Sequence, residues 1–149
     1  MSFANYLERD NVVSAKPFPE ELLKEIIKVI AVARKHKIKC TWHFNQYRIL
    51  IRGRANEGMV YEHIYHNSIG LDSLDSIRTH PCEDPFDSLV KVVLMLFQKY
   101  GLIVRWATDS SEHSPEWQEA VSLAKAIGLD YTKYMPRDSM AQTGFYGDL

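Results

Sequence analysis

The sequence predicts a mixed α+β fold, in which a mostly antiparallel sheet of about four strands packs against helices. Three observations support this class. Residues 85–100 form a helical segment that is apolar on almost every side, residues 38–65 alternate apolar and polar side chains, and amphipathic helical patterns precede and follow them. The predicted element order is therefore α-β-β-β-α-β-α, with the 85–100 helix buried at the centre.

The central helix has recognisable signals at both ends. Pro85 suits the first turn, where a missing N–H is not needed, and Asp87 places negative charge near the positive end of the dipole. Gly101 suits the left-handed residue that follows the last turn. Between these ends only Ser88, Lys91 and Gln98 form a narrow polar stripe, so we expect other elements to cover this helix on several sides.

Two further helices are predicted by three-and-four spacing of apolar residues. The first begins at Pro19, carries acidic residues in its first turn and basic residues in its last, and buries one stripe that includes Leu22, Ile26 and Ile30. The last begins at Pro115 and ends at Gly128, where a glycine commonly terminates a helix. Both helices are expected to pack one face on the sheet.

Period-two patterns predict four strands, over residues 38–45, 47–54, 59–67 and 102–108. In the first strand Trp42 falls on the inward set with Ile38, Cys40 and Phe44, which predicts that its indole belongs to the core. The inward face of the third strand is ambiguous, because Val60 and Ile64 compete with Met59, Tyr61 and Tyr65. We expect a short helix over residues 3–9, and a loop with a helical turn near residues 71–77.

A chain of 149 residues fits one domain, 1–149, with a lead-in arm over 1–18 and a tail over 136–149. The apolar and charged fractions, 46% and 25%, are those of an ordinary globular protein. The longest apolar run is too short to span a membrane, and the N-terminus has no secretion signal. Two cysteines are too few for a disulfide framework, so we expect reduced thiols and a cytoplasmic location.

Charge is segregated along the chain, although the net charge is only −1. Residues 22–54 contain nine basic residues and one acid, Glu25, whereas residues 55–90 contain seven acids and one basic residue, Arg78. This asymmetry predicts either a partner of opposite charge or mutual neutralisation of the two segments in the folded chain.

The outward positions of the first two strands gather the basic residues on one surface. Neighbouring side chains on one face of paired strands lie within about 5 Å of each other, so these cations form a patch. We predict a binding face for nucleic acid or for an acidic protein surface. The alternative is internal pairing with the acidic segment 57–87, or plain solvation. The predicted binding residues are Lys37, Lys39, His43, Asn45, Arg48, Arg52 and Arg54.

Possible metal ligands occur in short pairs, but strand geometry separates most of them. Residues three apart on a strand point to opposite faces, so Cys40 with His43, or His63 with His66, do not aim at one ion. Only His80 and Cys82 are expected in a loop, and they are the alternative metal pair. The prediction is that no metal and no cofactor is bound.

An enzymatic alternative centres on histidines and carboxylates. The segment 109–114 lies between a strand and a helix, where Asp109 and His113 would serve as acid and base, and His63 and His66 would serve a hydrolase or nuclease. No glycine-rich phosphate loop or nucleophile elbow accompanies them. The sequence therefore favours a small non-enzymatic binding protein of adaptor or inhibitor type, with a hydrolase or nuclease as the alternative.

Overall fold

The computed structural model describes residues 3–9, 17–54, 58–62, 74–79, 85–108 and 115–136. These residues form six strands, three α-helices and one short 3-10 helix. In chain order they are β1 (Phe3–Arg9), α1 (Glu20–Lys35), β2 (Thr41–Phe44), β3 (Arg48–Arg52), β4 (Gly58–Glu62), β5 (Leu74–Thr79), α2 (Phe86–Lys99), β6 (Ile103–Thr108), α3 (Pro115–Ala126) and η1 (Tyr131–Tyr134).

The α+β class predicted from the sequence is confirmed, and the helix, three strands, helix, strand and helix occur in the predicted order. Two strands are added to that order. The short helix expected over residues 3–9 is wrong, because this segment is β1, and the helical turn expected near residues 71–77 is wrong where the structure describes it, because β5 begins at Leu74.

The strands form two antiparallel three-stranded sheets. Sheet A has the order β5-β1-β6, and sheet B is the hairpin series β2-β3-β4. Since β1 is antiparallel to both of its neighbours, β5 and β6 run parallel to each other, and α2 connects them. A segment expected to be an N-terminal arm therefore supplies the central strand of sheet A.

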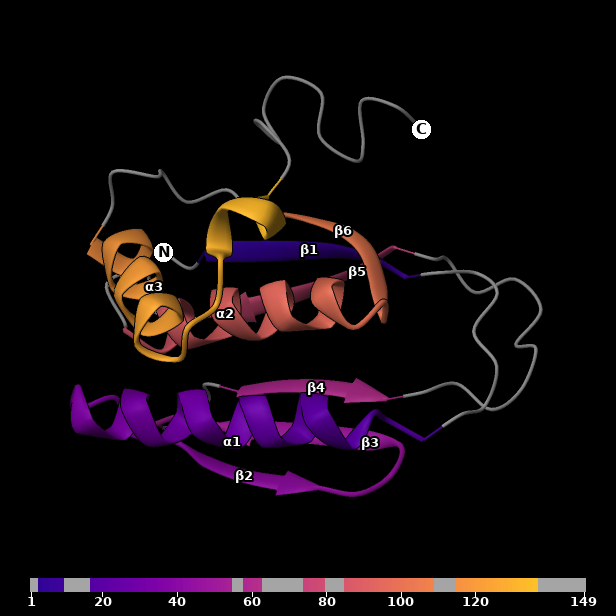
Figure 1. Ribbon diagram of the computed structural model, residues 1–149, viewed down its shortest axis with the longest axis horizontal. Helices are drawn as coiled ribbons and strands as arrows, with labels where there is room; N and C mark the ends of the chain where they lie inside the picture. Colours follow the sequence, from indigo (N-terminus) through magenta and orange to yellow (C-terminus); the bar gives the residue numbers. More distant parts are fainter. Residues whose placement is uncertain are drawn as a thin grey trace.

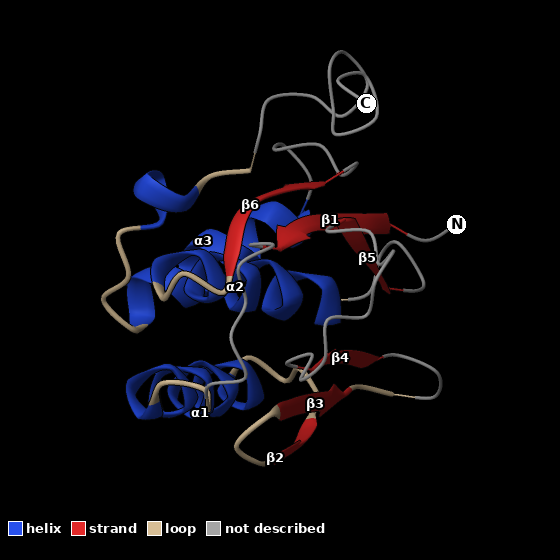
Figure 2. Cartoon of the chain, turned by 90° about the vertical axis from the view of Figure 1, so that its right-hand side faces the viewer, coloured by secondary structure: helices blue, strands red, loops and turns tan. Residues whose placement is uncertain are grey.

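Helix α2 lies at the centre of the molecule, as the sequence predicted. It is placed between sheet A on one side and α1 with sheet B on the other, while α3 packs beside it (Figures 1 and 2). Every residue from Phe86 to Phe97 is buried. Gly101 follows the last turn of the helix, and its φ of 77° is the left-handed conformation expected there.

Tyr61 is one of the residues that join sheet B to the rest of the core. Tyr61 on β4 packs its ring 4.7 Å from the ring of Phe97 on α2, and its hydroxyl donates to the carbonyl of Leu102 over 3.1 Å. Met59 and Tyr61 are buried and Val60 is 43% exposed, which settles the face of β4 that the sequence left ambiguous. The outer side of sheet B, opposite Ile49, Ile51 and Tyr61, is therefore the side that carries Val60.

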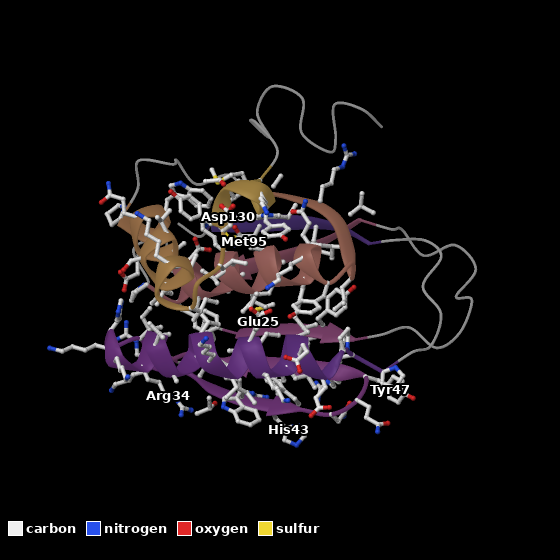
Figure 3. The ribbon with its side chains drawn as sticks, viewed as in Figure 1. Glu25, Arg34, His43, Tyr47, Met95 and Asp130 are labelled. Carbon is white, nitrogen blue, oxygen red and sulfur yellow. The ribbon has the colours of Figure 1, made fainter. Side chains whose placement is uncertain are left out.

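Contacts between side chains hold α1 against the two other helices. Glu25 points from α1 toward α2 (Figure 3), where Lys99 donates to both of its carboxylate oxygens over 3.1 Å and Tyr100 donates its hydroxyl to the same group. At the C-terminal end of α1, Nδ1 of His36 lies 2.9 Å from Oε1 of Glu119 on α3. The one acid of the basic segment is thus directed inward and is not on the surface of sheet B.

Candidate functional site

The outer face of sheet B brings together most of the basic residues predicted as a site. We define this outer face by Lys39, Thr41, His43, Asn45, Arg48, Leu50, Arg52 and Val60. The strand registry sets them in rows. Thr41 is opposite Arg52, and His43 is opposite Leu50, which in turn is opposite Val60. Leu50 and Val60 therefore form an apolar centre beside His43, and Lys39, Arg48 and Arg52 lie around it.

The cations of this outer face differ in their surroundings. Lys37, Lys39 and Arg52 are exposed, and in the described part of the chain no ion pair joins any of them. Arg48 is half-buried and has Glu62 as its cross-strand partner. The accessible positive charge therefore resides mainly in Lys39 and Arg52, with Lys37 at the end of α1.

Glycine at position 58 leaves space beside Arg52. Gly58 is the cross-strand neighbour of Arg52 on β4, so β4 itself places no side chain opposite this arginine. A Cβ at this position would lie 3.3 Å from the carbonyl oxygen of Ile51, which is a tight contact. Glycine at position 58 therefore avoids that contact, and it places no side chain of β4 opposite Arg52.

Asn45 lies in the turn between β2 and β3, at the position where the sequence predicts a tight turn. Its side-chain oxygen accepts from the backbone N–H of Tyr47 over 2.8 Å, and its own N–H donates to the carbonyl of Arg48 over 3.0 Å. These bonds form the turn between β2 and β3, so the side-chain oxygen Oδ1 of Asn45 already accepts a hydrogen bond within the turn. His43, by contrast, is exposed and points away from the molecule (Figure 3).

The prediction that Trp42 belongs to the core is wrong. Its side chain is 41% exposed, and its ring lies 4.7 Å from that of the half-buried Phe44, at an interplanar angle of 33°. The inward alternation itself holds, since Ile38 and Cys40 on the same set are buried. Trp42 lies on β2, which is an edge strand of sheet B, so no neighbouring described strand flanks its outer side.

Cys40 and His43 do not form a metal pair. Cys40 is buried and its pKa is raised by that burial, although the nearby Arg34 guanidinium acts in the opposite direction. His43 is exposed on the other side of the strand. Among the residues that the structure describes, no group of three or more His, Cys, Asp or Glu side chains is arranged to hold a metal ion.

Arg54 is exposed two residues beyond the end of β3 and is not part of the outer face. The alternative site residues fall outside the described part of the chain. These are the alternative catalytic residues Asp109, His113, His63 and His66, and the alternative metal pair His80 and Cys82. The C-terminal tail beyond Pro136 lies outside it as well.

A buried polar cluster beneath sheet A was not predicted. Lys91 on α2 donates to Asp87 one turn earlier, to Asn5 Oδ1 on β1 over 3.2 Å, and to Thr108 Oγ1 on β6 over 3.3 Å. Asn5 in turn donates to Asp87 Oδ1 over 2.7 Å. Asn5, Asp87 and Lys91 are fully buried, and each of the three ammonium hydrogens of Lys91 has an acceptor, so this cluster has a structural role.

Comparisons with known proteins add no family assignment. No protein-family model, curated protein sequence or solved structure matches this chain. Within the described residues, no helix has both the length and the apolar character needed to cross a membrane.

Proposed function

We propose that this chain is a small binding protein of adaptor or inhibitor type, without catalytic activity of its own, that engages an acidic partner through the outer face of sheet B. Phosphates of nucleic acid and carboxylates of an acidic protein surface are the two partner groups that this chemistry fits. A cytoplasmic setting belongs to the same proposal, because Cys40 is a buried free thiol.

The observation that carries this proposal is the exposure of Lys39 and Arg52 without ion pairs in the described part of the chain. Two acids that would otherwise compete for these cations are engaged elsewhere: Asp87 is buried with Lys91, and Glu25 accepts from Lys99. Lys39 and Arg52 lie at the end of this face away from Glu62, which is the cross-strand partner of Arg48. An exposed pair of cations on one strand face attracts an anion, since like charges at this spacing repel each other.

The test compares two double charge reversals by fluorescence anisotropy, with labelled oligothymidylate and labelled poly-L-glutamate as probes. Lys39→Glu with Arg52→Glu changes the outer face, and Lys125→Glu with Lys133→Glu makes the same change in net charge at exposed positions of α3 and η1. We expect the first pair to weaken binding of at least one probe by about tenfold or more, and the second by about twofold at most. Equal losses for the two pairs, or no binding of either probe, would contradict the proposal.

A further inference from the structure

We propose that the open edge of β2, at Trp42 and Phe44, is a strand-addition site for an extended acidic peptide segment of a partner protein. This inference rests on the proposed function and names its partner as a polypeptide whose residues alternate between acidic and apolar. The outer face would supply charge, and the edge would supply backbone hydrogen bonds.

The strand registry identifies which backbone groups point out of the sheet. The N–H of Asn45 donates to the carbonyl of Arg48, and in an antiparallel pair hydrogen-bonded and non-bonded positions alternate. His43 and Thr41 therefore direct their backbone groups to β3, whereas Trp42 and Phe44 direct theirs to the open side. Since β2 is the last strand of sheet B, no described strand pairs with these groups.

One end of this edge is already closed by the protein itself. The next outward-directed carbonyl is that of Cys40, and it accepts from Arg34 Nε over 3.1 Å and from Arg34 Nη2 over 3.0 Å. The arginine thus satisfies the carbonyl that lies nearest to the end of α1. The stretch that remains open offers two N–H groups and two carbonyls, at Trp42 and Phe44.

Exposed apolar side chains lie along the same edge. Trp42 is 41% exposed and its ring contacts that of the half-buried Phe44 at a tilt of 33°, and Ile27 of α1 is 38% exposed. Ile27 precedes Arg34 by about two helical turns, so both lie on the side of α1 that faces β2. An added strand would therefore place its inward side chains against these apolar groups and its outward side chains beside Lys39 and His43.

Charge argues for an acidic peptide and against a second copy of this chain. Pairing β2 with another β2 would bring Lys37, Lys39 and His43 of two molecules together, and opposed like charges destabilise a strand pair. Glutamate or aspartate at alternate positions of the added strand would instead face Lys39 and His43. A nucleic acid strand would stack on Trp42, yet it would leave the outward N–H and carbonyl groups of β2 without backbone partners.

The registry also specifies which peptide N–H groups matter. Residues that exchange hydrogen bonds with Trp42 and Phe44 share their face, so they are the apolar residues of the added strand. In a short peptide of alternating glutamate and valine, the valine N–H groups point to β2 and the glutamate N–H groups point to solvent. N-methylation at valine would remove the pairing donors, and N-methylation at glutamate provides a control of matched composition.

The experiment titrates the three peptides into the full chain and follows amide exchange by NMR. The expected result is that the unmodified and glutamate-methylated peptides slow exchange of the Trp42 and Phe44 amides about tenfold or more. The valine-methylated peptide should bind at least about tenfold more weakly. Equal binding of the two methylated peptides would overturn strand addition, as would binding that leaves both amides unprotected.

The same titration separates this inference from the proposed function. If peptide or oligothymidylate binding depends on Lys39 and Arg52 while the Trp42 and Phe44 amides stay unprotected, strand addition is wrong and the anion-binding face stands. If only oligothymidylate binds, and through those cations, the partner is nucleic acid and the inference is overturned. If no probe depends on Lys39 and Arg52, the proposed function fails together with the inference.

Discussion

Asn5 on β1 donates to Asp87 Oδ1 over 2.7 Å, although 82 residues separate the two along the chain. Lys91 completes this contact by donating to both residues, and all three side chains are fully buried. The cluster joins the central strand of sheet A to the central helix. It adds side-chain contacts with α2 to the backbone pairing that places β1 between β5 and β6.

Removing Asp87 should destabilise the fold strongly, because Lys91 would keep a buried charge without its carboxylate. We expect Asp87→Ala to lower the free energy of unfolding by about 3–5 kcal/mol in urea denaturation. Lys99→Ala, which breaks the partly exposed ion pair with Glu25, is the control and should cost about 1 kcal/mol or less. Similar losses for the two variants would show that the buried cluster is not a main element of stability.

Asn5→Ala tests the placement of β1 separately. The substitution removes one hydrogen bond to Asp87 and one from Lys91, and it leaves the ion pair of α2 in place. A loss of about 1–3 kcal/mol in the free energy of unfolding is expected, measured by the same urea titration. A change within about 0.5 kcal/mol is the range of an ordinary surface substitution and would argue against β1 as a buried central strand.

The contact between Tyr100 and Glu25 predicts loss of stability at alkaline pH. The hydrogen bond to the carboxylate, together with burial and the charge of Glu25, raises the pKa of Tyr100 from 10.0 to about 12. The folded state therefore holds this proton more tightly than the unfolded state. The contribution is fully present below pH 10.0 and is lost as the pH rises toward about 12.

A spectrophotometric titration of phenolate absorbance measures this shift. We expect Tyr100 to ionise late in the wild-type protein, and Glu25→Ala to move that ionisation back toward the ordinary tyrosine range. Tyr100→Phe should reduce the late absorbance change by that of one tyrosine. An undiminished late change in Tyr100→Phe would contradict the assignment.

Exposure of Trp42 is tested by acrylamide quenching of tryptophan fluorescence. Trp106 and Trp117 are 0% and 6% exposed, whereas Trp42 is 41% exposed, so one class of quenchable indole is expected. Trp42→Phe should abolish most of the quenching at low acrylamide. Trp117→Phe is the matched control and should leave the quenching in place. If the Trp42→Phe protein is quenched as strongly as wild type, the indole of Trp42 is not on the surface.

The elements predicted correctly from the sequence are those whose pattern is local. Helix α2 was expected over 85–100 and spans Phe86–Lys99, and the alternation of Ile49 and Ile51 with Leu50 identified the faces of β3. Strand β1 was missed because its inward side chains include Asn5. This polar residue is buried only because Asp87 and Lys91, far along the chain, satisfy it.

The candidate site was predicted in part for a related reason. Alternation placed Lys39, His43 and Arg52 outward, and the structure shows these three side chains exposed. It also placed Trp42 on the inward face of β2. That face is correct, but the side chain is 41% exposed on this edge strand. Alternation along one strand contains no information on which strand becomes the edge of a sheet, so the apolar component of the site emerged only from the strand order.

The salt dependence of anion binding gives the sharpest test of the outer face of sheet B. Affinity for oligothymidylate and for poly-L-glutamate should fall as salt rises, because Lys39 and Arg52 displace the cations that neutralise each polyanion and because salt screens the attraction. For oligothymidylate, Lys39→Glu with Arg52→Glu should make the slope of log affinity against log salt shallower by about one to two units, while Lys125→Glu with Lys133→Glu leaves it unchanged. Identical slopes for wild type and both double variants would contradict the assignment of binding to this face.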